Sequence, residues 1–205
     1  AVEREVHEFF VSMDTAQANA ADRARLFNRI AYVLHGLEEL PGLRRRIRER
    51  QLSPRQATQA FTRLIGGLLA VVFEAADTAA DPGITRVLVA LFNFMQGKEL
   101  AGQERAVGVE GFSRGHFDDE LQARLLHLQE GQERCFDIFG EFAGDEANAL
   151  WQQILGTDTV AQVISLRGVA KRTSATAQVD PGLCELWFEL NTQRIDAMKQ
   201  VESHL

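Results

Sequence analysis

The few prolines of this chain constrain its fold more than any other feature of the sequence. Four prolines occur in 205 residues, at positions 41, 54, 82 and 181. Three of them follow Ser53, Asp81 or Asp180. These residue types cap helices, and proline is well tolerated in the first turn after such a cap. The sequence therefore predicts helices that begin at residues 54, 82 and 181.

Other helix boundaries lie between the prolines. The Pro41-Gly42 pair is expected to end a helix that runs from about Asp22 to Leu40, and a further helix is expected to begin near Asp118. Asp145 and Asp158 are typical caps of two shorter helices. The segments between these boundaries are rich in alanine, leucine, glutamate, glutamine and arginine, which favour helices. No segment is predicted as a strand.

One predicted helix shows the apolar spacing of a bundle helix. Between residues 118 and 142 the side chains expected on one face recur at intervals of four and three. They are Leu121, Leu125, Leu128, Gln132, Cys135, Phe139 and Phe142. Long helices with short connections pack as antiparallel neighbours. We therefore predict an all-α fold made of one or two antiparallel helical bundles.

Charge and hydropathy exclude several classes of protein. The chain carries 22 basic and 29 acidic residues, for a net charge of -7, and so lacks the basic surplus of a nucleic-acid-binding domain. The basic run from Arg44 to Arg50 has no interleaved aromatic residues and is interpreted as a solvated face. The longest apolar stretch, residues 64–73, is far shorter than the roughly 20 residues that cross a bilayer. With no signal-peptide pattern at its start, we expect a cytoplasmic protein without membrane contact.

The helix predicted after Pro82 combines cations with apolar residues on one face. The residues at three-four spacing along it are Leu91, Phe94, Lys98, Ala101, Arg105, Gly108 and Phe112. Lys98 and Arg105 are therefore expected on a buried stripe. Four glycines, at positions 97, 102, 108 and 111, lie inside the same helix, and each costs about 1 kcal/mol relative to alanine. Such a concentration indicates close approach of a neighbouring backbone or of a ligand.

Arginines also interrupt the apolar faces of two later helices. Arg167 lies among apolar residues of the helix that begins near Asp158, and Arg194 does so in the final helix. A buried guanidinium is costly unless it is paired, so each needs a protein carboxylate, such as Glu99 or Glu104, or a bound anion. Planar guanidinium groups suit planar oxyanions such as carboxylate, nitrate and nitrite. Arg194 is nearer the chain end and is expected to be solvated or salt-bridged.

Signatures of catalysis and cofactor binding are missing from the sequence. It has no Gly-rich phosphate-binding motif. None of its five histidines has an acidic residue three positions before it, as the di-iron sites of helical bundles require. No nucleophile with a base and no set of metal ligands emerges. We therefore expect that the protein is not an enzyme and holds neither metal nor cofactor.

Residues 92–117 closely resemble the signature of the NIT family, the nitrate- and nitrite-sensing domain of bacterial regulators. Their sequence is FNFMQGKELAGQERAVGVEGFSRGHF. Within it, Lys98-Glu99, Gly102 and Glu104-Arg105-Ala106 match the family pattern KE..G.ERA. The resemblance covers nearly the whole chain and is also carried by residues 40–47, 53–69 and 185–205.

The resemblance implies a fold and a ligand. The fold is a pair of packed four-helix-type bundles that share long helices, and the ligand is nitrate or nitrite, held by arginines from different helices. Arg105 lies in the intact motif, and Arg167 lies in the short helix before the tryptophan helix. The third ligand-binding residue is Arg4, in Glu3-Arg4-Glu5, where the family has an ERG-type motif.

The resulting hypothesis is a sensor domain that spans residues 1–205. It binds nitrate or nitrite between its arginines and switches an attached transcription-antitermination output. The resemblance implies a homodimer, and RNA contact is expected only through a C-terminal ANTAR-type output domain that this chain does not include. Two alternatives are open. One is a ligand-free helical scaffold or dimerisation module whose arginines pair with glutamates, and the other is a sensor of another small anion.

Overall fold

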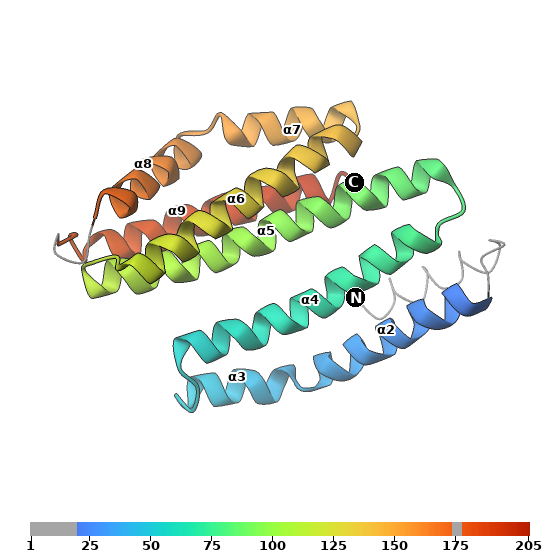
Figure 1. Cartoon of the computed structure of the whole chain (residues 1–205), viewed down its shortest axis with the longest axis horizontal. Coiled ribbons are helices and arrows are strands. Elements are labelled where there is room, and N and C mark those ends of the chain that lie inside the picture. Colours follow the sequence, from blue (N-terminus) through green and yellow to red (C-terminus); the bar gives the residue numbers. More distant parts are fainter. Residues whose placement is uncertain (1–19, 174–177) are drawn as a thin grey trace.

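The computed structural model of the chain describes residues 20–173 and 178–205, with side chains from residue 24 onward. The described residues form helices and contain no strand (Figure 1). The helices are α2 (Ala20–Glu38), α3 (Leu40–Arg48), α4 (Pro54–Thr78), α5 (Pro82–Arg114), α6 (Asp119–Phe142), α7 (Asp145–Leu155), α8 (Asp158–Arg172) and α9 (Leu183–Glu202). The predicted all-α fold is confirmed.

Helix α5 lies at the centre of the molecule and is 33 residues long. On one side it packs against α4, which pairs with α2, and on the other side it packs against α6 and α9 (Figure 1). Helices α7 and α8 follow one another along the chain, and both pack against α9. The helices therefore form two groups, α2–α5 and α5–α9, which share α5. This agrees with the prediction of bundles that share long helices.

Capping residues set the starts of the long helices, as predicted. Ser53 accepts a hydrogen bond from the backbone N–H of Gln56, at 3.2 Å, in a complete capping box at the start of α4. Asp81 and Asp118 accept hydrogen bonds in the same way from the first turns of α5 and α6. Each of these side chains satisfies backbone donors that have no partner within the helix.

Three later helices begin slightly away from the predicted positions. Helix α9 begins at Leu183 rather than at residue 181, because the Asp180 carboxylate accepts the N–H of Gly182 and holds a turn there. Helices α7 and α8 begin at the two aspartates predicted as caps. Their capping positions are the preceding residues, Gly144 and Thr157.

The helix predicted to end near Leu40 does end close to that position, but the Pro41-Gly42 pair does not close it. Helix α2 ends at Glu38, and both residues lie in the first turn of the separate helix α3. Proline fits that position because the N–H it lacks would have no partner in the first turn of a helix.

Apolar spacing identifies the buried face of α6, whereas on α5 it identifies Phe94, Ala101, Gly108 and Phe112 but not the other predicted residues. On α6 the predicted face is buried at Leu121, Leu125, Leu128, Gln132 and Phe139. On α5 the buried line passes through Ala90, Phe94, Gly97, Ala101, Glu104, Gly108 and Gly111. Lys98 and Arg105 lie beside this line and are half-buried, so the expectation of two cations on a buried stripe is wrong. Helix α5 contacts α4, α6 and α9, and spacing does not single out one face of a helix covered on several sides.

Three of the four glycines in the interior of α5 lie directly against aromatic rings. A β-carbon at Gly97 would lie 2.7 Å from the ring of Phe136, and β-carbons at Gly108 and Gly111 would overlap the rings of Trp187 and Phe117. Gly102 has open space around it. Close approach is thus found at three positions, but aromatic side chains make it rather than the neighbouring backbone or ligand that was expected.

The core of the α5–α9 group contains two apolar clusters. One includes Phe112, Phe117 and Trp187, and the other includes Phe94 and Phe139. Rings pack closely in both, with centroids 5.0 Å apart for Phe112 and Phe117 and 4.7 Å apart for Phe94 and Phe139. Between the two clusters, buried positions of α5, α6 and α9 are polar. We call this set of buried side chains, Glu104, Gln129, Gln132 and Arg194, the polar layer.

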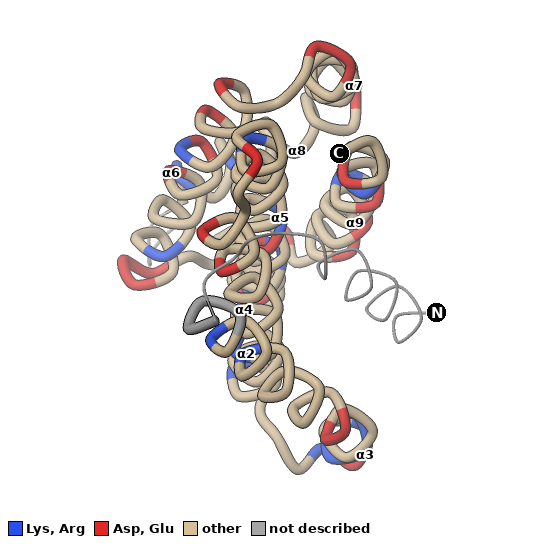
Figure 2. Tube along the Cα trace, turned by 90° about the vertical axis from the view of Figure 1, so that its right-hand side faces the viewer, with Lys and Arg blue, Asp and Glu red and all other residues tan. Residues whose placement is uncertain are grey.

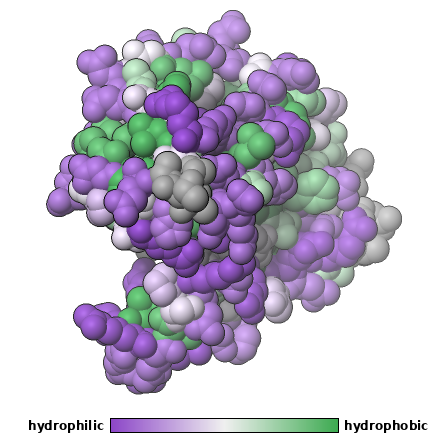
Figure 3. All heavy atoms as spheres, turned by 60° about the vertical axis from the view of Figure 1, so that its left-hand side comes forward, coloured by the Kyte–Doolittle hydropathy of each residue, from purple (hydrophilic) through white to green (hydrophobic). Residues whose placement is uncertain are grey.

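The surface is largely hydrophilic on the face drawn in Figure 3, where hydrophobic residues form separate patches. The arginines at 44, 45, 46 and 48 are exposed on α3 (Figure 2), as expected for a solvated basic run. In the described part of the chain, one helix is long and apolar enough to cross a membrane by length and composition alone. It is α4, with a mean hydropathy of 1.3 over its most apolar window, and it packs between α2 and α5.

Candidate functional site

The centre of the polar layer is the carboxylate of Glu104 on α5, which is 0% exposed. Arg167 of α8 binds it through two parallel hydrogen bonds. Its Nε donates to Oε1 at 2.7 Å, and its Nη2 donates to Oε2 at 2.7 Å. Such bidentate hydrogen bonding is among the strongest interactions that an arginine makes with a planar oxyanion.

Two glutamines of α6 complete the surroundings of this carboxylate. The side-chain amide of Gln129 donates to Oε1 of Glu104 at 3.0 Å, and that of Gln132 donates to Oε2 at 2.9 Å. Each carboxylate oxygen therefore accepts one hydrogen bond from arginine and one from glutamine. Burial raises the pKa of Glu104, but the charge and hydrogen bonds of Arg167, the charge of Arg194 and the Gln132 bond together lower it below its usual value. The carboxylate is ionised at neutral pH.

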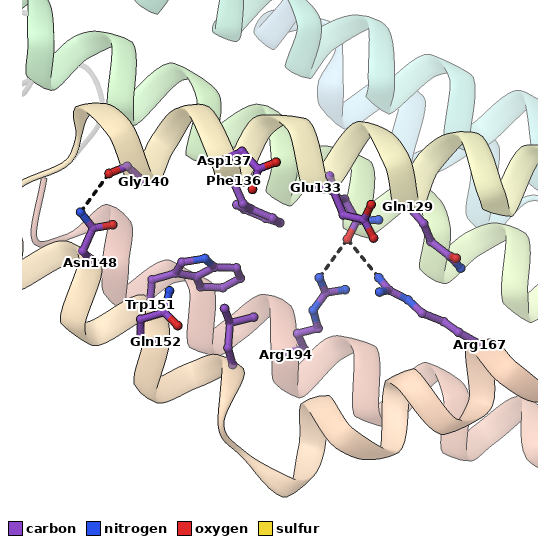
Figure 4. Close-up of a pocket in the computed structure, with 12 residues that line it drawn as sticks. Gln129, Glu133, Phe136, Asp137, Gly140, Asn148, Trp151, Gln152, Arg167 and Arg194 are labelled. Atoms are coloured by element: carbon purple, nitrogen blue, oxygen red, sulfur yellow. Dashed lines mark hydrogen bonds between the residues drawn. The ribbon is translucent and has the colours of Figure 1, made fainter.

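Arg194 of α9 reaches the same layer and is 5% exposed. Its Nη2 donates to Oε1 of Gln132 at 2.9 Å, and Nη2 of Arg167 lies 3.3 Å from the same oxygen (Figure 4, dashed lines). Its Nη1 lies 3.6 Å from Oε2 of Glu104. Burial and the neighbouring charge of Arg167 lower the pKa of Arg194 to about 10, although Glu104 opposes that shift. Arg194 is therefore cationic at neutral pH.

A cavity of about 380 Å³ opens beside the polar layer. It is bounded by α6, α7, α8 and α9, and the side chains of Arg167 and Arg194 reach it from α8 and α9 (Figure 4). Aromatic residues Phe136 and Trp151 form its apolar wall. The cavity is lined by Gln129, Gln132, Glu133, Phe136, Asp137, Gly140, Asn148, Trp151, Gln152, Leu155, Arg167 and Arg194.

Of the arginines predicted to bind a ligand, Arg167 lies in this cluster and Arg105 does not. The Nη1 of Arg105 donates to the Thr192 hydroxyl at 2.8 Å, and its guanidinium carbon lies 5.0 Å from the centre of the Phe188 ring. Arg105 and Arg167 thus contact different groups within the described residues. Arg4 lies outside the described residues.

The prediction that a protein carboxylate pairs with buried arginines is confirmed for Glu104, which contacts both Arg167 and Arg194. Arg194 was expected to be solvated or salt-bridged, and it is salt-bridged, to Glu104. Sequence reasoning did not assign roles to Gln129 and Gln132. A signal was present for Gln132, a polar residue in the otherwise apolar stripe of α6, because buried polar groups require hydrogen-bond partners.

The described residues contain no group of three or more His, Cys, Asp or Glu side chains that could hold a metal ion. The polar layer has no nucleophile beside a general base. What this cluster can do chemically is bind charge, because the guanidinium and amide N–H groups of Gln129, Gln132, Arg167 and Arg194 are fixed on three different helices, α6, α8 and α9. Fold and site together define an all-helical domain with buried, clustered guanidinium groups.

The chain belongs to the nitrate and nitrite sensing family, whose profile matches residues 1–205. A relative from Klebsiella oxytoca, described as a nitrate regulatory protein, is 38% identical over 205 residues, which cover all of this chain and 50% of the relative. The solved structure of the NasR transcription antiterminator has a TM-score of 0.80 and 36% identity, over 98% of this chain and 54% of that one. The chain thus spans about half the length of these relatives.

Proposed function

We propose that this domain binds nitrate or nitrite and reports its presence to a regulatory output. The observation that best supports the proposal is the positive surplus of the site, where the guanidinium groups of Arg167 and Arg194 face the single carboxylate of Glu104. One monoanion would balance this charge and relieve the repulsion between the two cations. The family to which the chain belongs indicates which anion that is.

The anion is held between Arg105 and Arg167, and Arg4 contributes a third guanidinium. Successive residues of a helix point about 100° apart, so Glu104 and Arg105 do not face Arg167 together. Binding therefore requires Arg167 to exchange the Glu104 carboxylate for the anion, and Arg105 to leave the Thr192 hydroxyl that it contacts here.

This exchange is the basis of a switch. An anion shifts a conformational equilibrium only by its difference in affinity for the two states. In the state with converged arginines, the anion accepts charge-assisted hydrogen bonds from both Arg105 and Arg167. In the state described here, these two side chains are bound to Thr192 and Glu104 instead. Because α5, α8 and α9 carry the arginines and their present partners, binding repositions these three helices.

The output lies outside this domain. One relative is named a nitrate regulatory protein and another a transcription antiterminator, and each is about twice as long as the matched segment. We place the domain in such a regulator, where it acts as a homodimer and controls antitermination through an RNA-binding output domain.

Titration calorimetry with nitrate and with nitrite tests the assignment. We expect binding by the unaltered domain and a loss of affinity of about tenfold or more in Arg105→Ala, because each charge-assisted hydrogen bond contributes roughly 1.5–3 kcal/mol. Arg134→Ala, which removes an exposed arginine of α6, is the matched control and leaves the affinity unchanged. Unchanged affinity in Arg105→Ala would exclude that residue from the site.

A ligand-free scaffold is the second candidate function. It is supported by the two short hydrogen bonds between Arg167 and Glu104, which pair this arginine without any ligand. A thermal-shift panel with nitrate, nitrite, formate, acetate and chloride separates the candidates. A scaffold shows no stabilisation by any of them, and a sensor of another anion responds to a carboxylate more strongly than to nitrate.

A further inference from the structure

Arg194 has hydrogen-bonding capacity that the protein does not use. Among the described residues, neither its Nε nor its Nη1 has a hydrogen-bond partner. A guanidinium group carries five N–H donors in one plane, and Arg194 gives one nitrogen, Nη2, to Gln132. A buried charged donor without a partner is costly. Arg194 is nearly fully buried and lines the cavity, so the residue that carries these unused donors adjoins a space that a small ligand can enter.

Glu104 does not accept a hydrogen bond from Nε or Nη1 of Arg194. Both of its carboxylate oxygens already accept two hydrogen bonds each, from Arg167, Gln129 and Gln132. The distance of 3.6 Å from Oε2 to Nη1 of Arg194 is an ion-pair contact without a hydrogen bond. Two cations therefore share one carboxylate, and Arg194 is the one less completely paired.

We propose that Arg194 forms an anion site in the cavity between α6, α7 and α9, and that this site takes one small planar monoanion. It is distinct from the site between Arg105 and Arg167, and it rests on the proposed function only for the identity of nitrate or nitrite as the natural anion. Nitrate, nitrite and short carboxylates share the chemistry, since each presents coplanar oxygens to coplanar N–H donors.

The surroundings of the cavity favour a single negative charge. One monoanion brings the charge of Arg167, Arg194 and Glu104 to zero. The exposed carboxylates of Glu133 and Asp137 also line the cavity; they oppose the entry of any anion, and they oppose a dianion more strongly than a monoanion. The site therefore selects nitrate, nitrite or formate over sulfate. Its apolar wall, formed by Phe136 and Trp151 (Figure 4), accommodates the weakly hydrated face of a planar ion.

The test uses the 205-residue chain, with nitrate, nitrite, formate, acetate, chloride and sulfate as probes in calorimetry and thermal shift. Arg194→Gln removes the charge and retains an amide that can bind Gln132. We expect it to weaken nitrate binding by about tenfold or more. Sulfate is expected to give no stabilisation beyond that of chloride at equal ionic strength.

A second variant keeps the test valid if Arg194→Gln fails to fold. Gln152 is exposed and lines the cavity, whereas its neighbour Gln153 is exposed and does not line it. Gln152→Glu adds a negative charge at the cavity and is expected to weaken nitrate binding by about threefold to tenfold. Gln153→Glu adds the same charge to the same helix and is expected to change affinity less than twofold, by about the effect of a screened surface charge.

The outcomes separate this site from the proposed function. If Arg194→Gln and Gln152→Glu bind nitrate like the unaltered chain while Arg105→Ala loses it, the Arg194 site is overturned and nitrate sensing stands. If formate or acetate binds, nitrate and nitrite do not, and the same two variants weaken that binding, the site stands and nitrate sensing is overturned. If no anion binds, both are overturned.

Discussion

The carboxylate of Glu104 accepts a bidentate pair of hydrogen bonds from Arg167, each 2.7 Å long, as a bound planar oxyanion would. At the scale of single residues, Glu104 is therefore an internal counter-anion for the buried arginines. Its removal leaves Arg167 and Arg194 side by side without a negative charge. Breaking a buried ion pair by removing one partner costs about 3–5 kcal/mol.

Glu104→Gln is accordingly expected to lower the free energy of unfolding by about 3–5 kcal/mol, as measured by urea denaturation in an anion-poor buffer. Glu133→Gln is the matched control, because it removes an exposed carboxylate of α6, and exposed substitutions usually change stability by less than about 0.5 kcal/mol. Equal stability of the two variants would contradict the role of Glu104 as counter-anion.

At the scale of the element, α5 combines close packing with a buried polar residue. Its glycines allow the rings of Phe136, Trp187 and Phe117 to reach the helix backbone, and its Glu104 faces α6, α8 and α9. The helix thus holds the polar layer at a set distance from both aromatic clusters. Because Glu104 of α5 contacts Gln129, Gln132, Arg167 and Arg194 directly, a movement of α5 relative to α6, α8 and α9 changes the contacts of these groups.

Two glycine substitutions in α5 test this packing. Gly108→Ala places a methyl group on the indole of Trp187, and such overpacking typically costs about 1–3 kcal/mol. Gly102→Ala places the same methyl group in open space and is expected to stabilise the helix by about 1 kcal/mol. Opposite shifts in the melting temperature of the two variants are the expected result. A stabilising Gly108→Ala would show that Trp187 moves without cost.

At the scale of the whole molecule, the polar layer joins helices that are far apart in the sequence. Arg167 and Arg194 come from α8 and α9, whereas their carboxylate comes from α5, 63 residues before Arg167. Helices α2 to α4 pack on the other side of α5. A change at the site therefore has a physical path to both helical groups, through the one helix that they share.

The stability of the whole molecule should depend on pH through its paired carboxylates. The pKa of Glu104 is lowered in the folded protein from its ordinary value of 4.5, because the effects of Arg167 and Arg194 outweigh burial. The unfolded chain then binds more protons than the folded protein at acid pH, so stability rises with pH in that range. The contribution is complete above pH 4.5 and is lost as pH falls through the lower folded pKa.

We therefore expect the melting temperature to be level above pH of about 5 and to fall as the pH drops below 4.5. Glu104→Gln should show a shallower fall. The variant should keep part of the fall in melting temperature, because the pKa of Glu74 is lowered as well. Hydrogen bonds and charges of Arg29 and Arg25 outweigh the burial of that carboxyl group. Identical acid profiles for the unaltered protein and Glu104→Gln would exclude Glu104 as a source of the pH dependence.

The helical class, most helix starts and the family could be predicted from the amino-acid sequence alone. The starts of α4, α5 and α6 depend on local contacts, such as the hydrogen bond from Gln56 N–H to Ser53, which involve residues close together in the chain. The buried face of α6 was also predictable, because that helix has one apolar face and one hydrophilic face. These features are visible in a sequence because each arises within a single helix.

The contacts between charged groups could not be predicted in this way, because they depend on how the helices pack. Spacing placed Arg105 on the buried stripe of α5, but the buried residue is its neighbour Glu104. Helix α5 contacts α4, α6 and α9, so its apolar residues do not mark a single face. The meeting of Glu104, Gln132, Arg167 and Arg194 depends on the packing of four helices. The pattern of a single helix cannot predict that arrangement, since the charge partners of each arginine lie on other helices.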